Sequence, residues 1–132
     1  MIRPATEDDI DFLAELEILL FPENRLNERV LRNEIEHGLC YVIEGRGYLL
    51  TRWDEELVDV LRLGIHPEHQ HQGLGRELME YLLERVWTPV VLTVRMDNLP
   101  ARKLYESLGF TYTGWMPPVD ALVMTKRRGD RE

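Results

Sequence analysis

The sequence predicts a mixed α/β fold, in the broad sense that includes α+β arrangements, with one sheet that contains both parallel and antiparallel neighbours. Three observations predict it. The 132 residues fit a single domain that buries its own core. Strand and helix patterns alternate in the centre of the chain, which implies parallel pairing there. Strand patterns joined by short turns imply antiparallel pairing elsewhere.

The first forty residues predict a short strand followed by two helices. Residues 2–5 have a strand pattern, and Thr6 is a candidate N-cap for a helix over about 7–20, where apolar residues recur at helical spacing. A second helix is predicted over about 27–37, and Gly38 is a suitable residue for its C′ position.

The rest of the chain predicts six further strands and two helices. A hairpin is expected over 39–44 and 48–53, and a strand with period-2 alternation over 57–65. The elements expected after it are a helix from Gly73 to about Val86, a strand over 90–95, a helix capped by Asn98 or Asp97 and closed by Gly109, strands over 110–114 and 121–126, and a frayed tail over 127–132.

The charge is unevenly distributed along the chain. The net charge is −8, and the first 60 residues hold 6 basic and 15 acidic side chains, against 10 and 9 in the remainder. No basic field is present to attract phosphates, so nucleic acid is not an expected partner. The acidic half is able to attract a cationic substrate, and a merely solvated acidic surface is the alternative.

Other features give no reason to expect a membrane span, and they exclude a zinc site built on cysteines. No apolar run approaches the roughly 20 residues that span a bilayer, and the chain does not open with a signal-peptide pattern. Cys40 is the single cysteine, which predicts a reducing, cytoplasmic compartment. The turn histidines at 66, 69 and 71 lack the spacing of a metal site, so no metal is expected. The oligomeric state stays open between monomer and homodimer.

Residues 70–76, Gln-His-Gln-Gly-Leu-Gly-Arg, form a polar turn that runs into a helix. The backbone N–H groups at a helix N-terminus lack internal partners, and glycine lets a ligand approach them closely. Such a turn suits a phosphate or pyrophosphate. No third small residue follows Gly75, as a dinucleotide fingerprint requires, and no Gly-Lys-Ser/Thr is present, as a nucleotide triphosphate loop requires.

Gln70-x-x-Gly73-x-Gly75 resembles the (Arg/Gln)-x-x-Gly-x-(Gly/Ala) signature of the GNAT-type N-acetyltransferases. Residues 63–68 are similar to the fourth strand and following turn of that family, and residues 98–110 are similar to its second acetyl-CoA motif. The Val-Arg-x-x-Asn and Leu-Tyr-Glu-Ser-Leu-Gly-Phe strings are closest in character to the ribosomal-protein N-terminal acetyltransferases.

The resemblance implies a fold for the single domain 1–132 and separate binding regions within it for the acceptor and for acetyl-CoA. The fold is a mixed, mostly antiparallel sheet of six to seven strands, with helices on both faces and a splay between the fourth and fifth strands. Residues 1–60 would lie mainly on the acceptor side, and residues 61–114 would form the acetyl-CoA-binding core. The residues that would bind acetyl-CoA are Leu63, Gly64, Ile65, Gln70, His71, Gln72, Gly73, Leu74, Gly75, Arg76 and Asn98.

The implied reaction transfers an acetyl group from acetyl-CoA directly to a primary amine, without a covalent enzyme intermediate. Tyr105 stands at the family's general-acid position, where a phenol can protonate the departing thiolate. Its alternative role is that of an amphipathic aromatic at the end of a packed helix. The backbone N–H near Ile65 is the expected oxyanion donor.

The general base is less clearly indicated. Thr93 stands where similar members carry a glutamate. Other members carry a carboxylate on the fourth strand, and Asp59 occupies that position here, on the predicted face of Leu63 and Ile65. A solvent-facing role for Asp59 and a chain of water molecules in place of a base are the alternatives.

The acceptor is expected between the two N-terminal helices and the turn at 117–118. A peptide N-terminus, a lysine, a polyamine and an amino sugar are the candidate amines. The competing hypothesis is a module of the same fold that binds acyl-CoA or protein and has lost catalysis, because Thr93 removes the expected base.

Overall fold

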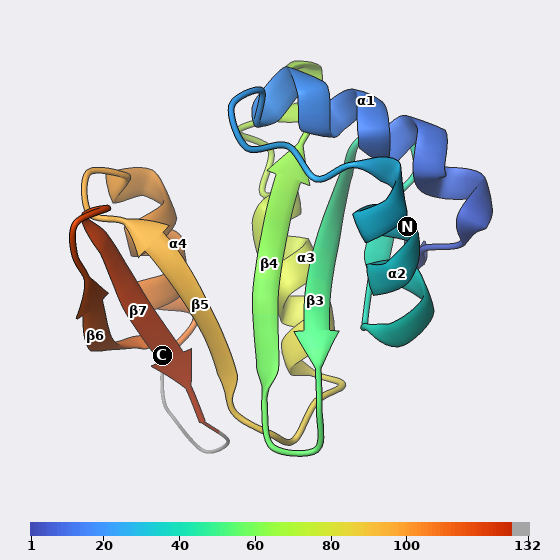
Figure 1. Ribbon diagram of the computed structural model, residues 1–132. Coiled ribbons are helices and arrows are strands. Elements are labelled where there is room, and N and C mark those ends of the chain that lie inside the picture. Colours follow the sequence, from blue (N-terminus) through green and yellow to red (C-terminus); the bar gives the residue numbers. More distant parts are fainter. Residues whose placement is uncertain (128–132) are drawn as a thin grey trace.

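The computed structural model describes residues 1–127 and forms one seven-stranded sheet with helices on both faces (Figure 1). The sheet order is β1-β2-β3-β4-β5-β7-β6. The strands are β1 (Ile2–Pro4), β2 (Tyr41–Ile43), β3 (Gly47–Trp53), β4 (Val58–Ile65), β5 (Val90–Arg95), β6 (Thr111–Met116) and β7 (Ala121–Lys126). The helices are α1 (Ile10–Leu20), α2 (Glu28–His37), α3 (Leu74–Leu83) and α4 (Leu99–Ser107), with short 3-10 turns η1 (Glu7–Asp9) and η2 (Pro67–His69).

The order of elements confirms the sequence prediction, with small differences at their ends. The strand expected over 39–44 shortens to β2, and the one expected over 110–114 extends to Met116. The helix expected to reach Val86 ends at Leu83. Of the tail predicted over 127–132, residues 128–132 lie outside the described part of the chain. No helix of the described chain combines the length and the apolar character that crossing a membrane requires.

The sheet is mostly antiparallel, and its one parallel pair opens into a splay. Val58 pairs with Val90 and Asp59 with Val91, and these are the pairs that join β4 to β5. Beyond them the two strands diverge, as Figure 1 shows. The mixed sheet and the splay implied by the family resemblance are both present. Residues 60–65 of β4 therefore keep a backbone edge that no strand of the described chain covers.

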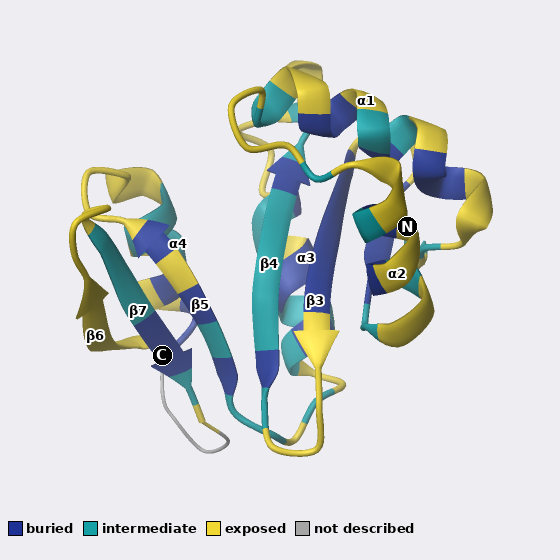
Figure 2. Ribbon diagram, in the orientation of Figure 1, coloured by how far each residue is buried: buried dark blue, intermediate teal, exposed yellow. Residues whose placement is uncertain are grey.

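Two hydrophobic cores lie on the two faces of the sheet. The core beneath α1 and α2 contains Leu13, Leu16 and Leu31 with Val42 and Leu50 of the sheet. The core beneath α3 and α4 is larger. Figure 2 shows β3 buried along most of its length, whereas β6 is exposed throughout. β3 therefore lies in the buried part of the sheet, and β4 separates it from the splay.

The predicted helix over 7–20 begins as a tighter 3-10 turn. The Asp9 N–H donates to Thr6 O at 2.9 Å, and the Thr6 N–H donates to the Asp9 carboxylate at 2.8 Å. Arg3 also donates two hydrogen bonds to that carboxylate, which holds the pKa of Asp9 below its usual value. These contacts close a three-residue turn before α1 proper starts.

Gly38 ends α2 for a different reason from the one predicted. Its φ of −108° is not left-handed, so the C′ role with positive φ is wrong. A Cβ at this position would lie 2.0 Å from the Thr51 carbonyl oxygen. Glycine is required here because the end of α2 packs directly on the backbone of β3.

A β-bulge in β4 overturns the predicted common face of Asp59, Leu63 and Ile65. Leu50 pairs with Arg62 and Thr51 with Val60, so Leu61 is an extra residue on β4. One extra residue inverts the alternation of side chains along a strand. Leu63 and Ile65 consequently pack into the core beneath α3. Asp59 faces the other side, opposite Arg52, which binds Glu34 of α2.

Candidate active site

The polar turn before α3 has the backbone geometry of an anion site. His71 and Gly73 have φ values of 63° and 80°, and Gly73 is the N-cap of the helix. Glu77 lies in the first turn of α3, and its N–H bonds back to Gly73 O at 3.1 Å. The N–H groups of Gly73, Leu74 and Gly75 have no acceptor among residues 1–127. The turn therefore presents a series of unsatisfied donors at the positive end of a helix.

A cavity of about 360 Å³, which we call the turn cavity, lies between this turn, β4 and α4. Its lining residues are Leu63, Ile65, His69, Gln70, His71, Gly73, Leu74, Gly75, Asn98, Pro100, Ala101, Leu104 and Tyr105. Most of the residues predicted to bind acetyl-CoA are thus brought together at one place. Gly64, Gln72 and Arg76 do not line it. Gly64 instead faces the Tyr48 ring, where a Cβ would lie 2.6 Å away.

The uncovered edge of β4 forms one wall of the turn cavity. His66 N–H donates to Arg46 O on the β3 side at 2.7 Å. Because successive N–H groups of a strand point in opposite directions, the Ile65 N–H points toward the splay. The Gln70 side chain donates to Ile65 O at 3.1 Å and so ties the turn to this edge.

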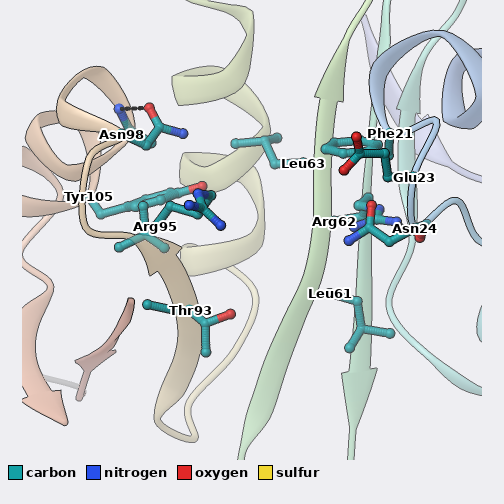
Figure 3. Close-up of a pocket in the computed structure, with 13 residues that line it drawn as sticks. Phe21, Glu23, Asn24, Leu61, Arg62, Leu63, Thr93, Arg95, Asn98 and Tyr105 are labelled. Atoms are coloured by element: carbon teal, nitrogen blue, oxygen red, sulfur yellow. Dashed lines mark hydrogen bonds between the residues drawn. The ribbon is translucent and has the colours of Figure 1, made fainter. Parts of the chain in front are cut away.

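A second cavity of about 870 Å³, which we call the splay cavity, opens between β4 and β5 on the α1 side of the sheet (Figure 3). Its lining residues are Phe21, Glu23, Asn24, Leu61, Arg62, Leu63, Thr93, Val94, Arg95, Asn98, Ala101, Tyr105 and Ala121. Four residues, Leu63, Asn98, Ala101 and Tyr105, also line the turn cavity. The two cavities therefore meet at the splay.

Tyr105 lies where the two cavities meet. The residue is 8% exposed, and burial raises the pKa of its hydroxyl to about 12. The hydroxyl has no hydrogen-bond partner within the described chain. In Figure 3 the side chain extends from α4 toward β4. Asn98 caps α4 by accepting the Ala101 N–H at 3.3 Å, which fixes the start of the helix that carries Tyr105.

A buried polar network holds the loop that follows α1, residues 21–26, against β4. The Glu17 carboxylate is fully buried and accepts from the Tyr48 hydroxyl at 2.5 Å and from Arg62 Nε at 3.1 Å. It also accepts the Leu26 N–H at 2.7 Å. Sequence reasoning missed this network, although a glutamate within the apolar face of α1 is a signal that could have found it.

The carboxylates around the splay cavity are placed differently from the prediction. Glu23 is the acidic residue that lines the cavity among the described residues, and it was missed because it lies in a loop. Asp59 lines neither cavity, although burial raises the pKa of its carboxyl against the opposing effect of Arg52. Thr93 lines the splay cavity and supplies no charge there. The base assignment to Asp59 stays a prediction.

The remaining candidates from the sequence are the turn histidines and Cys40, which lies outside both cavities. Residues 1–127 contain no group of three or more His, Cys, Asp or Glu side chains that could hold a metal ion. Cys40 is buried beneath α2, and burial raises the pKa of its thiol to about 11. A thiol with so high a pKa is a poor nucleophile at neutral pH.

Comparison with known proteins identifies relatives of this chain. A mycothiol acetyltransferase from Acidothermus cellulolyticus is 45% identical over 64 residues, which are 46% of this chain and 20% of that protein. The [ribosomal protein bS18]-alanine N-acetyltransferase of Escherichia coli K12 is 42% identical over 55 residues, 39% of this chain and 37% of that protein. The chain thus spans well under half the length of the curated relatives it matches.

The fold is shared with solved structures at lower sequence identity. Arabidopsis thaliana NAA60 in complex with acetyl-CoA superposes with a TM-score of 0.80 at 17% identity, over 96% of this chain and 98% of that one. The model of the Acetyltransferase (GNAT) family matches residues 10–110, which include the splay, the turn and Tyr105. With the match covering most of the chain and the expected geometry present, the protein belongs to the GNAT acetyltransferase family.

Proposed function

We propose that this chain is an acetyl-CoA-dependent N-acetyltransferase that moves the acetyl group directly to a primary amine. A protein N-terminus, a lysine side chain or a small cationic amine are the acceptor classes considered. The observation that carries the proposal is the position of Tyr105 at the junction of two cavities, where its hydroxyl has no hydrogen-bond partner among residues 1–127. A donor that enters from one face of the sheet and an acceptor from the other can meet at that point.

The turn cavity fits the pyrophosphate and pantetheine arm of acetyl-CoA. The N–H groups of Gly73, Leu74 and Gly75 are available to phosphate oxygens. The open edge of β4 at Leu63 and Ile65 offers backbone groups to the amides of the arm, as an added strand would use them. The acetyl-CoA in the structurally similar NAA60 supports this assignment. Asn98 lines the cavity on its opposite side.

Acetyl-CoA supplies an acyl group that is activated as a thioester. The amine nitrogen forms a bond to the acyl carbon as the carbon–sulfur bond breaks, and the Ile65 N–H stabilises the negative charge on the acyl oxygen. Tyr105 gives its proton to the thiolate, because its raised pKa keeps the phenol protonated throughout the physiological range. The amine loses a proton to Asp59, to Glu23 or to water, which balances the transfer.

The competing hypothesis is a catalytically weak module that binds acyl-CoA or protein. Thr93 favours it, because it brings no base into the splay cavity. A monomeric or homodimeric state and a cytoplasmic location stay predictions from the sequence.

The deciding experiment measures thiol release from acetyl-CoA across a panel of peptides, polyamines, amino sugars and amino acids, with acetyl-CoA affinity measured in parallel. Acceptor-dependent thiol release with a matching acetylated amine supports the transferase. Saturable acetyl-CoA binding without turnover on any acceptor supports the binding module. Absence of acetyl-CoA binding overturns both functions, since both use the turn cavity.

A further inference from the structure

Side chains of both charge signs line the splay cavity and restrict what the acceptor can be. Within the described chain the charged lining residues are Glu23, Arg62 and Arg95. Two guanidinium groups thus face the cavity with one carboxylate. This local charge differs from that of the first 60 residues, whose 15 acidic and 6 basic side chains favour a cationic acceptor.

Arg62 forms a fixed donor on the β4 wall of the cavity. Its Nε and Nη2 bind Glu17, and Nη2 also donates to Asn24 O at 2.7 Å. The guanidinium stacks over the Phe21 ring at 4.0 Å from the ring centre, and the side chain is 13% exposed. Its Nη1 makes no hydrogen bond to any residue of the described chain. A guanidinium held in this way is preorganised to donate from the remaining nitrogen.

Arg95 provides a second guanidinium from the β5 wall. It follows Thr93 by two residues on the exposed side of β5, and Figure 3 shows it beside Tyr105, extending toward β4. Its Nε lies 3.4 Å from Asp97 Oδ1, and both side chains are more than half exposed, so this ion pair is weak. Neither Nη atom of Arg95 has a hydrogen-bond partner among residues 1–127. A carboxylate in the cavity can therefore accept hydrogen bonds from the two Nη atoms of Arg95.

We propose that the acceptor is an α-amino acid, whose carboxylate is bound by Arg95 and approached by Arg62 from the opposite wall. The inference rests on the proposed transferase function and narrows its acceptor. Because the carboxylate and amine of an α-amino acid are attached to the same carbon, binding of the carboxylate at Arg95 holds the nitrogen close to Tyr105. Glu23 then faces the ammonium form of the acceptor across the same cavity.

The test compares free α-amino acids with their α-carboxamides, which keep the amine and remove the negative charge. We expect the wild-type protein to use at least one free acid with a kcat/KM at least about 10-fold above that of its amide, the typical effect of a hydrogen bond to a charged group. Arg95→Gln should remove this preference by raising the KM for the acid, and Arg95→Lys should restore part of it. The KM for acetyl-CoA should not change. Arg46→Gln, on an exposed turn away from both cavities, is the matched control.

Each outcome decides the inference. Equal use of acid and amide, or an Arg95→Gln variant that keeps the preference, overturns the amino-acid acceptor and leaves the transferase function in place. Acetylation of peptides or polyamines without acetylation of any free amino acid likewise overturns the amino-acid acceptor and leaves the transferase function in place. Binding of acetyl-CoA without turnover on any amine refutes the transferase function itself, and the acceptor inference with it.

Discussion

The turn cavity and the splay cavity are built from different kinds of groups. The turn cavity is lined largely by a continuous stretch of chain, residues 69–75, and offers backbone N–H groups. The splay cavity is assembled from the α1–α2 loop, β4, β5 and α4, and offers charged side chains. In the function that we propose, the turn cavity takes a cosubstrate whose phosphates and amides can be bound by backbone groups. The acceptor that we propose for the splay cavity would be distinguished by side-chain contacts from residues that are far apart in sequence.

The largest expected effect concerns the network that supports the splay cavity. Glu17→Gln should lower the free energy of unfolding by about 3 kcal/mol, because it leaves the Arg62 charge partly buried without a counter-ion. Chemical denaturation of the wild type and the variant measures this free energy of unfolding. Glu15→Gln, an exposed change on the same helix, is the control and should shift stability by less than about 0.5 kcal/mol. A small effect of Glu17→Gln would mean that the loop is held by packing alone.

The junction of the two cavities is tested by Tyr105→Phe. We expect kcat to fall by about 100-fold or more, because the general acid is removed, with the KM for acetyl-CoA nearly unchanged. Steady-state kinetics with varied acetyl-CoA measures both. Tyr112→Phe, on the exposed strand β6, should leave kcat unchanged. An active Tyr105→Phe variant would reassign Tyr105 to a purely packing role.

The turn cavity is tested by Gly75→Val. A Cβ at Gly75 lies 3.5 Å from Leu63 Cδ2, so the added methyl groups enter the cavity itself. We expect the Kd for CoA to rise by at least about 10-fold, equivalent to about 1.4 kcal/mol. Gly75→Ala adds the Cβ alone at an ordinary contact distance and should bind CoA nearly as well as wild type. The Kd for CoA is measured by calorimetry. An unchanged Kd for the valine variant would show that the pantetheine arm does not bind in the turn cavity.

The smallest expected effect is that of Asp59→Asn, because Asp59 lines neither cavity. We expect kcat/KM to stay within about 2-fold, with the acidic limb of its pH profile retained. Burial raises the pKa of the Asp59 carboxyl. As the pH is lowered, this carboxylate therefore takes up its proton, and stops acting as a base, at a higher pH than an ordinary aspartate does. Loss of that limb in Asp59→Asn, and its retention in Glu23→Gln, would identify Asp59 as the base.

Two predictions that depended on local chemistry, one for a helix cap and one for a buried helix face, were confirmed. The side chain of Asn98 caps α4, and the apolar spacing of α3 buries Leu74, Leu78 and Leu82 in the core. Capping and helical periodicity act within a few residues, so they can be read along the chain. The prediction that Asp59 shares a face with Leu63 and Ile65 was wrong, because that face depends on pairing between strands, which cannot be read along β4 alone. The extra residue at Leu61 is defined by pairing with β3, and no local pattern on β4 marks it.

The sequence by itself determined the order of elements, the glycine turn at Gly73–Gly75 before α3 and the family resemblance, because each depends on backbone preferences and spacing within short segments. The tertiary structure alone decided where Arg62, Arg95 and Glu23 lie relative to Tyr105. These residues come from β4, β5, a loop and a helix, and their meeting depends on the divergence of β4 from β5. Such long-range geometry arises from packing of the whole sheet, which no single segment of sequence records.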